Sequence, residues 1–247
     1  MGVGEAVCGG LRRVCGVAYL ASRWIVRQPI WLVQSVAVTL GFFALLYAWG
    51  GRAGVSNFVI GAVVAGMWGV GINIVGQDIG WYRLMRLYDM FVATELTPTQ
   101  FILGMFLSSI VFEAVTMTAY LPIALVFGAV RQLVASLAVG VAELTLAIFL
   151  GLVVAMRVSA ATNVSSVTNT LSSVLQVLPP VFYPAHLLPG TVKYAVMAVP
   201  TAAAAELARQ LSGLGASVPV AVPLASLNAW ILSAFLVANK VVRWGMG

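Results

Sequence analysis

The sequence predicts an all-α integral membrane protein with six transmembrane helices. Composition is the first reason: 62% of the 247 residues are hydrophobic, only 8% are charged, and the mean hydropathy is +1.03. Soluble domains carry about 25% charged residues, so these few charges cannot cover a water-exposed globule. Apolar runs of about twenty residues recur along the chain, each long enough to cross a bilayer as a helix. The third reason is the distribution of basic residues, described below.

Residues 1–28 are expected to form an amphipathic helix at the membrane interface, ahead of a six-span domain at 29–247. Its apolar positions are Val7, Leu11, Val14, Cys15 and Ala18, and its cationic side holds Arg12, Arg13, Arg23 and Arg27. This pattern is typical of a helix lying in the headgroup region. The alternative is a plain basic cytoplasmic tail.

The six spans are expected at about 29–49, 57–77, 99–126, 132–156, 164–182 and 218–239. A polar segment at 78–98 follows the second span, and a proline-dense segment follows the fifth. Span 2 is rich in glycine, which permits close helix approach, and span 5 begins with a run of Ser, Thr and Asn. Small and polar residues favour contacts between helices in lipid. The polar run of span 5 therefore either packs against other helices or lines a cavity.

The basic residues set the orientation. Six spans place both termini on one side, and nine basic residues fall on that side against four on the other. The nine are Arg12, Arg13, Arg23, Arg27, Arg83, Arg86, Arg157, Lys240 and Arg243, and the four are Arg52, Arg131, Lys193 and Arg209. The positive-inside rule then predicts a multi-pass protein of the cell membrane with cytoplasmic termini.

Several function classes are disfavoured by what the sequence lacks. No cluster of basic residues indicates nucleic-acid binding. No GxxxxGK[ST] motif occurs, since Lys193 and Lys240 are followed by Tyr and Val. His186 is the one histidine, and Cys8 and Cys15 do not have a metal-binding or redox spacing. We therefore expect neither an enzyme acting alone nor a metal or cofactor bound by this chain.

Two motifs resemble those of the membrane subunits of ABC-2-type exporters. After the fifth span the family has a pattern like S-G-v-f-y-P…L-P…P-x…R. The corresponding residues here are Val181-Phe182-Tyr183-Pro184, Leu188-Pro189, Pro200-Thr201 and Arg209. A second family pattern, t-P-x-x-x-x-l-G, resembles residues 97–104, TPTQFILG. The sequence departs from the family at Pro180, which replaces a glycine, and at 87–91, where a Gly-Thr-Leu-Glu motif is often found.

The resemblance implies a dimer of permease subunits, as homodimer or heterodimer, with two separate ATPase subunits that bind ATP and Mg²⁺. It implies that spans 2 and 5 form the pathway and dimer surface. It also implies that an amphipathic helix within 79–97 is a coupling helix seated on the ATPase. The coupling candidates are Tyr82, Arg83, Arg86, Asp89 and Glu95. The alternative is an interfacial helix without a partner.

The resemblance further implies that the proline-dense segment forms short helices that help to close the outer exit. Proline breaks a helix, and backbone freed at membrane depth must be covered by protein or by a water-filled cavity. The outer-gate candidates are Phe182, Tyr183, Pro184, Pro189 and Pro200. A surface loop that merely stops two helices is the alternative.

Polar residues inside the predicted spans are candidates for the pathway. Glu113 and Glu143 lie at membrane depth, where a carboxyl group is costly and is a functional candidate by default. Asn163 and Asn169 lie at the start of span 5. Each glutamate either packs between helices by hydrogen bonding or faces the pathway.

The leading functional prediction is the permease subunit of an ATP-driven exporter of an amphipathic, lipid-like or drug-like substrate. A proton-coupled secondary transporter that uses Glu113 or Glu143 is the alternative, and an integral-membrane enzyme or scaffold is a third interpretation.

Overall fold

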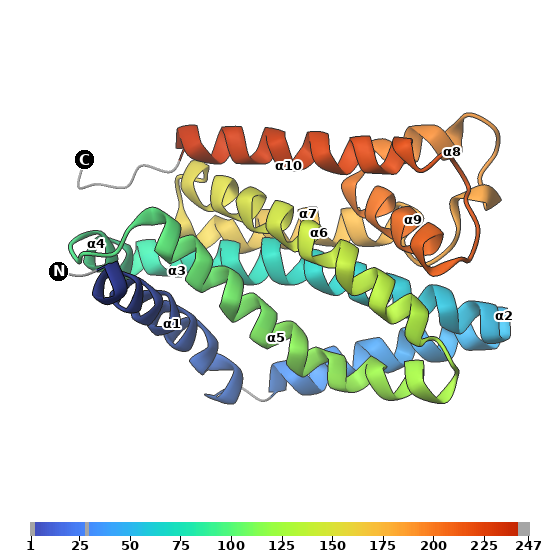
Figure 1. Cartoon of the computed structure of the whole chain (residues 1–247), viewed down its shortest axis with the longest axis horizontal. Helices are drawn as coiled ribbons and strands as arrows, with labels where there is room; N and C mark the ends of the chain where they lie inside the picture. The colour runs from blue at the N-terminus through green and yellow to red at the C-terminus, as the bar shows by residue number, and fades with distance from the viewer. Residues whose placement is uncertain (1–2, 28–29, 242–247) are drawn as a thin grey trace.

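The computed structural model describes residues 3–27 and 30–241 and is helical throughout, with no strand in these two ranges. The α-helices are α1 (Val3–Arg27), α2 (Ile30–Gly69), α3 (Gly76–Leu84), α4 (Leu87–Val92), α5 (Pro98–Val126), α6 (Val130–Arg157), α7 (Ala161–Val177), α8 (Val192–Ala195), α9 (Pro200–Ser212) and α10 (Ala221–Val241). Long helices run along one axis, and short ones gather at either end (Figure 1).

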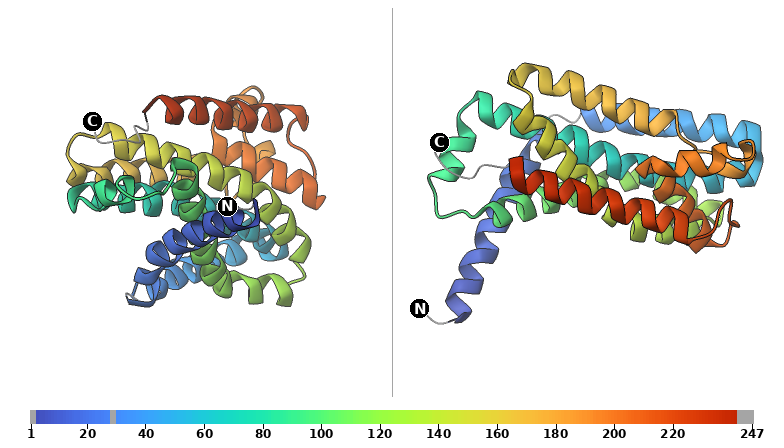
Figure 2. Two further views of the ribbon diagram at one scale, coloured as in Figure 1. Left: turned by 60° about the vertical axis from the view of Figure 1, so that its left-hand side comes forward. Right: turned by 90° about the horizontal axis from the view of Figure 1, so that it is seen from above.

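Helix α2 contains a reversal and forms two arms that lie side by side (Figure 1, Figure 2). The chain turns at Gly51, whose φ of 52° and ψ of −134° suit a residue without a Cβ. The second arm continues without a break through a π-helical segment, η1 (Val70–Val75), into α3. The predicted turn at 50–56 is thus a single residue, and the second span extends well beyond residue 77.

Among the described residues, four helical stretches are long and apolar enough to cross a membrane: Leu32–Leu84, Pro98–Val126, Val130–Arg157 and Ala221–Val241. This confirms the prediction of an all-helical protein with helices long and apolar enough to cross a membrane. The first stretch has 53 residues and includes both arms of α2. At 17 residues and with many polar side chains, α7 is not among the four.

Helices α5 and α6 form a hairpin, and clear local signals begin and end them. Thr97 and Gln100 make a capping box at the start of α5, and Pro98 occupies the first turn. The hairpin turns through Phe127–Ala129, where Gly128 has a φ of 72°. This turn lies at the same end of the molecule as the Gly51 bend (Figure 1).

The proline-dense segment forms a compact set of short helices at that end. Helix α7 stops at Val177, ahead of Pro179 and Pro180. The 3₁₀ turn η2 (Ala185–Leu187), helix α8, the 3₁₀ turn η3 (Val196–Ala198) and helix α9 follow. Helix α9 packs between α6, α10 and α2, and its residues 200–209 are all buried. Helix α9 is therefore part of the packed core, whereas α8 contributes no buried residue.

Helix α1 crosses the bundle steeply and lies against the first half of α5 (Figure 2). Val17 fits against Gly104 of α5, where no Cβ could be added without a clash. The helix expected in the N-terminal segment is observed as α1, whereas its place in a membrane interface stays a prediction.

The glycines of the second α2 arm and of its continuation lie against side chains from other parts of the same chain. Their neighbours are Phe182 at Gly61, Glu113 at Gly66, Gln176 at Gly69, Ala147 at Gly71 and Thr168 at Gly76. These five glycines therefore allow close packing within the subunit, and the expectation that this span also forms a dimer surface stays a prediction.

Candidate functional site

Arg209 forms three hydrogen bonds at the end of the molecule that contains the proline-dense segment. Its side chain is only 2% exposed. The guanidinium donates to the carbonyl oxygens of Pro180 at 3.1 Å and Val181 at 2.6 Å, and to Oδ1 of Asn57 at 2.9 Å. The prolines end α7 and leave carbonyl groups without helical partners, and this arginine on α9 satisfies two of them.

A second hydrogen-bond network ties α9 to the start of α10. Glu206 Oε1 accepts from the backbone N–H of Ser217 at 2.6 Å and from Nε2 of Gln210 at 3.0 Å. Burial lowers the pKa of Arg209 to about 10, an effect that the charge of Glu206 opposes. The guanidinium therefore stays charged at neutral pH, and its bonds to the carbonyl groups are charge-assisted.

Of the outer-gate candidates, Phe182 makes the most specific contact. Its ring lies in the space left by Gly61 on α2 and stacks on Phe42 with centroids 5.0 Å apart and an interplanar angle of 16°. Tyr183 is half-buried, Pro184 precedes η2, and Pro189 is exposed. Pro200 is buried and begins α9, where its missing N–H has no consequence.

At the opposite end, three of the five coupling candidates are engaged within the chain. The Tyr82 and Phe91 rings meet edge to face, with centroids 5.6 Å apart. Arg83 donates to the carbonyl oxygens of Ala155 and Val158, at the C-terminal end of α6. Glu95 forms an ion pair with Arg13 of α1. These three side chains hold α1, α3, α4 and α6 together.

The other two candidates, Arg86 and Asp89, lie exposed at the tip formed by α3 and α4. Segment 79–97 is not a single helix: Arg86 adopts a left-handed conformation with a φ of 57° and separates α3 from α4. The prediction of one helix over 79–97 is wrong, because one residue in this conformation ends the helix. Around Arg86, large apolar side chains are exposed: Trp81 by 52%, Leu84 by 51%, Met85 by 62% and Met90 by 63%.

Glu113 is buried on α5 and has a partner from its own helix. The Tyr120 hydroxyl donates to its Oε1, and the carboxyl group lies against Gly66 of α2. Oε2 has no hydrogen-bond partner. Because residues 113 and 120 are two helical turns apart, they share one face of α5.

Glu143 differs from Glu113 in having no partner at all. It is fully buried on α6, and neither carboxyl oxygen is hydrogen-bonded. The two glutamates are therefore not joined to each other. Burying a carboxyl group without a hydrogen-bond partner is costly. The packing of the described residues therefore does not explain why a glutamate occupies position 143.

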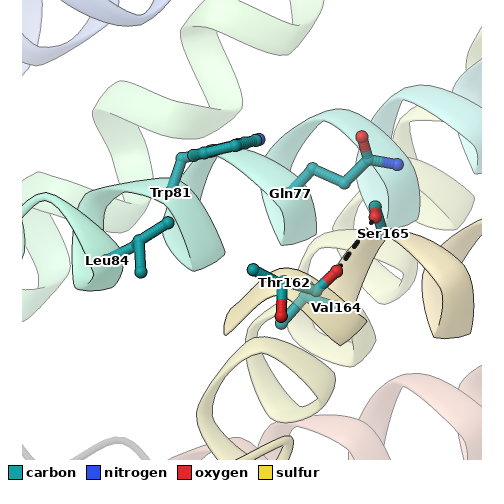
Figure 3. A pocket seen from close by; sticks show the side chains of 6 residues that line it. All are labelled: Gln77, Trp81, Leu84, Thr162, Val164 and Ser165. Carbon is teal, nitrogen blue, oxygen red and sulfur yellow. Dashed lines mark hydrogen bonds between the residues drawn. The ribbon is translucent and has the colours of Figure 1, made fainter. Parts of the chain in front are cut away.

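A polar seam joins α3 to α7. Nε2 of Gln77 donates to Oδ1 of Asn169 at 3.1 Å and to Oγ1 of Thr168 at 3.3 Å. Beside this contact is a hollow of about 20 Å³, large enough for a single water molecule, which Gln77 and Trp81 line from α3 and Thr162, Val164 and Ser165 from α7 (Figure 3). Asn163 lies near the seam at the exposed start of α7.

Three findings on this site could not be reached from single residues in sequence. Gln77 donates a hydrogen bond to Asn169, and Tyr120 donates one to Glu113. Arg209 donates to the carbonyl oxygen of Val181, which follows the prolines that end α7. Only the Glu113–Tyr120 pair carries a local signal, namely a separation of seven residues on a helix. The partners of Gln77 and Arg209 are distant in sequence.

No group of His, Cys, Asp or Glu side chains that could hold a metal ion occurs within residues 3–27 and 30–241. The comparisons with known proteins found neither a matching family model nor a matching curated protein. The resemblance to ABC-2-type exporters therefore rests on the two motifs and remains a proposal.

Proposed function

We propose that this chain is the membrane subunit of an ABC-2-type exporter, which works as a dimer with two separate ATPase subunits. The exposed tip made by α3 and α4 is the single observation that carries this proposal. It combines four large apolar side chains with a cation and an anion, Arg86 and Asp89. A surface of this kind suits a groove in a partner protein better than it suits water.

In the proposed topology the six crossings are the two arms of α2, then α5, α6, α7 and α10. Both termini and the α3–α4 tip lie in the cytoplasm, and the Gly51 bend and α9 lie outside. Nine of the thirteen basic residues then fall on the inner side, which supports this orientation in the cell membrane. ATP and Mg²⁺ would bind to the ATPase partner and not to this chain.

The segment from η2 to α9 is proposed to be the outer gate, as short helices that return into the bundle. Support comes from the burial of α9 and from the Arg209 bonds to the carbonyl groups freed by the prolines. Backbone that leaves the helical pattern at membrane depth needs such protein partners. Phe182, seated against Gly61, would be the moving side chain of this gate.

The second copy is proposed to meet this one along α7. Asn163, Ser166, Asn169, Thr170 and Ser173 are all exposed on that helix. Polar side chains are costly against lipid tails, so a second subunit or a water-filled pathway would cover them. An amphipathic, lipid-like or drug-like substrate fits a pathway with this polar wall beside apolar helices.

The test is co-purification with the Walker-type ATPase encoded nearest to the gene. Met85→Glu with Met90→Glu places two charges on the tip. The control is Leu187→Glu with Leu211→Glu, which alters side chains of similar exposure, 65% and 52%, at the other end. The tip variant is expected to retain at least tenfold less ATPase, and the control to retain the wild-type amount. Undiminished association of the tip variant would refute the proposal.

A proton-coupled secondary transporter is the second candidate, and the unpartnered Glu143 favours it. In that case Glu143→Gln, or Glu113→Gln, would abolish uptake or efflux driven by an imposed proton gradient in vesicles without nucleotide. Transport that requires ATP and the ATPase subunit, and that survives both substitutions, would exclude this candidate.

A further inference from the structure

Helix α1 presents a strongly cationic face to the outside of the molecule. Arg12, Arg23 and Arg27 are exposed, and their spacing of eleven and four residues places them on one side of the helix. Residues 8–27 contain no acidic residue. The opposite side of α1 is buried, with Val17 and Ala21 packed in the core. The arginines are thus held outward by the packing of the helix.

An apolar hollow opens beside this face. It has a volume of about 220 Å³ and lies between α1 and the segment that joins α4 to α5. Its apolar walls are Val17 and Leu20 of α1, Phe91 of α4 and Leu96 of the joining segment. Arg13, Gly16, Thr94 and Glu95 complete its lining.

Gly16 connects the two features. It lies on α1 between Arg12 and Arg23 on the cationic side and also lines the hollow. A Cβ at Gly16 would have no atom within 4 Å, so the absence of a side chain leaves open space here. A molecule with an anionic group and an apolar chain could therefore touch both features at once.

We propose that α1 binds one anionic phospholipid, with its phosphate on the arginine face and part of an acyl chain in the hollow. Guanidinium groups bind phosphate through paired charge-assisted hydrogen bonds. Basic residues near an anionic leaflet are attracted to its surface. A lipid would contact both the arginines and the apolar walls of the hollow, whereas an acidic protein surface would contact the arginines alone.

The site also touches the tip region through one ion pair. Arg13 and Glu95 form part of the hollow's lining and join α1 to the residues just ahead of α5. A bound lipid would therefore fasten α1 to the α4–α5 segment. The proposal requires only that α1 lies at a membrane surface, and it does not depend on the exporter function.

Native mass spectrometry of the full chain, purified with equal amounts of phosphatidylglycerol and phosphatidylcholine, tests the proposal. Wild type is expected to retain phosphatidylglycerol at least tenfold over phosphatidylcholine. The variant Arg12→Gln with Arg23→Gln and Arg27→Gln should lose most of this preference. Gly16→Leu, which fills the hollow, should reduce occupancy by either lipid about fivefold.

Two matched controls accompany these variants. Gly9→Leu makes the same change on α1 away from the hollow, and Arg131→Gln removes an exposed arginine at the other end of the molecule. Both should behave as wild type. Equal retention of the two lipids by wild type would overturn the proposal and leave the arginines to an acidic protein partner. Unchanged occupancy in Gly16→Leu would equally overturn it, because the hollow would then hold no acyl chain.

Discussion

The two ends of the bundle are built in opposite ways. At the α9 end, charged side chains are buried and hydrogen-bonded, and Arg209 alone satisfies three acceptors. At the α4 end, apolar side chains such as Met85 and Met90 are exposed, and a non-glycine residue holds a left-handed conformation. Exposed apolar side chains also occur at the first end, for example Leu187 and Leu211, so the ends differ in the buried Arg209 network at one and the left-handed Arg86 at the other.

The largest expected effect comes from Arg209→Met. The change leaves the Pro180 and Val181 carbonyl groups and the Asn57 side chain without their donor, at about 1–3 kcal/mol for each buried acceptor. We expect the free energy of unfolding in mixed detergent–SDS micelles to fall by about 3 kcal/mol or more. Arg131→Met, at an exposed position, is the control and should change it by less than about 0.5 kcal/mol. A loss for Arg209→Met no greater than the control's would show that the α9 end is not held by this arginine.

A smaller loss of unfolding free energy is expected for Gly61→Ala. A methyl group at this position overlaps the ring of Phe182, and overpacking of this kind costs about 1–3 kcal/mol. The same substitution in a Phe182→Ala background should cost almost nothing, since the overlapping ring is gone. A double-mutant cycle measured by SDS unfolding gives the coupling. If Gly61→Ala lowers the unfolding free energy equally with and without the Phe182 ring, Phe182 does not pack against Gly61.

At the other end, Arg86→Gly is expected to increase stability. A left-handed conformation costs an L-residue about 1–2 kcal/mol, and glycine avoids most of that cost. The expected gain in unfolding free energy is about 1 kcal/mol. Arg157→Gly, at the end of α6, removes an exposed arginine from helical backbone and should instead lose stability. Destabilisation by Arg86→Gly would mean that its side chain holds the tip together.

The smallest effect on folding is expected for Met85→Ser with Met90→Ser. Both side chains are more than 60% exposed, and changes at such positions stay within about 0.5 kcal/mol. Thermal unfolding in detergent should therefore match wild type, while association with an ATPase partner falls. A clear loss of thermal stability would place these methionines in the packing of the subunit and remove the contrast between the two ends.

The positions of the long helices could be predicted from sequence, because apolar run length and proline placement are local signals. The predicted spans at 99–126 and 132–156 agree closely with α5 and α6. The fifth span, expected at about 164–182, differs at its end, because α7 stops at Val177, ahead of Pro179 and Pro180. These features depend on neighbours in the chain and on no other part of the fold.

The details of the candidate sites could not be predicted in the same way. The sequence gives no sign that Arg83 and Glu95 have partners within the chain. Arg83 bonds to carbonyl groups at the end of α6, and Glu95 pairs with Arg13 of α1. The break at Arg86 has no sequence signal, since arginine seldom adopts a left-handed conformation. The glycines of α2 indicate close approach but do not identify the approaching group.

The uninterrupted helix from Arg52 to Leu84 has one further consequence. At 1.5 Å per residue it is about 50 Å long, against a hydrocarbon thickness of about 30 Å. If this helix moves as one rigid body, a tilt imposed at Leu84 would displace its far end at the Gly51 bend and also Gly61, against which Phe182 packs. Force applied at one face of the bilayer would thereby reach the opposite face through a single piece of secondary structure.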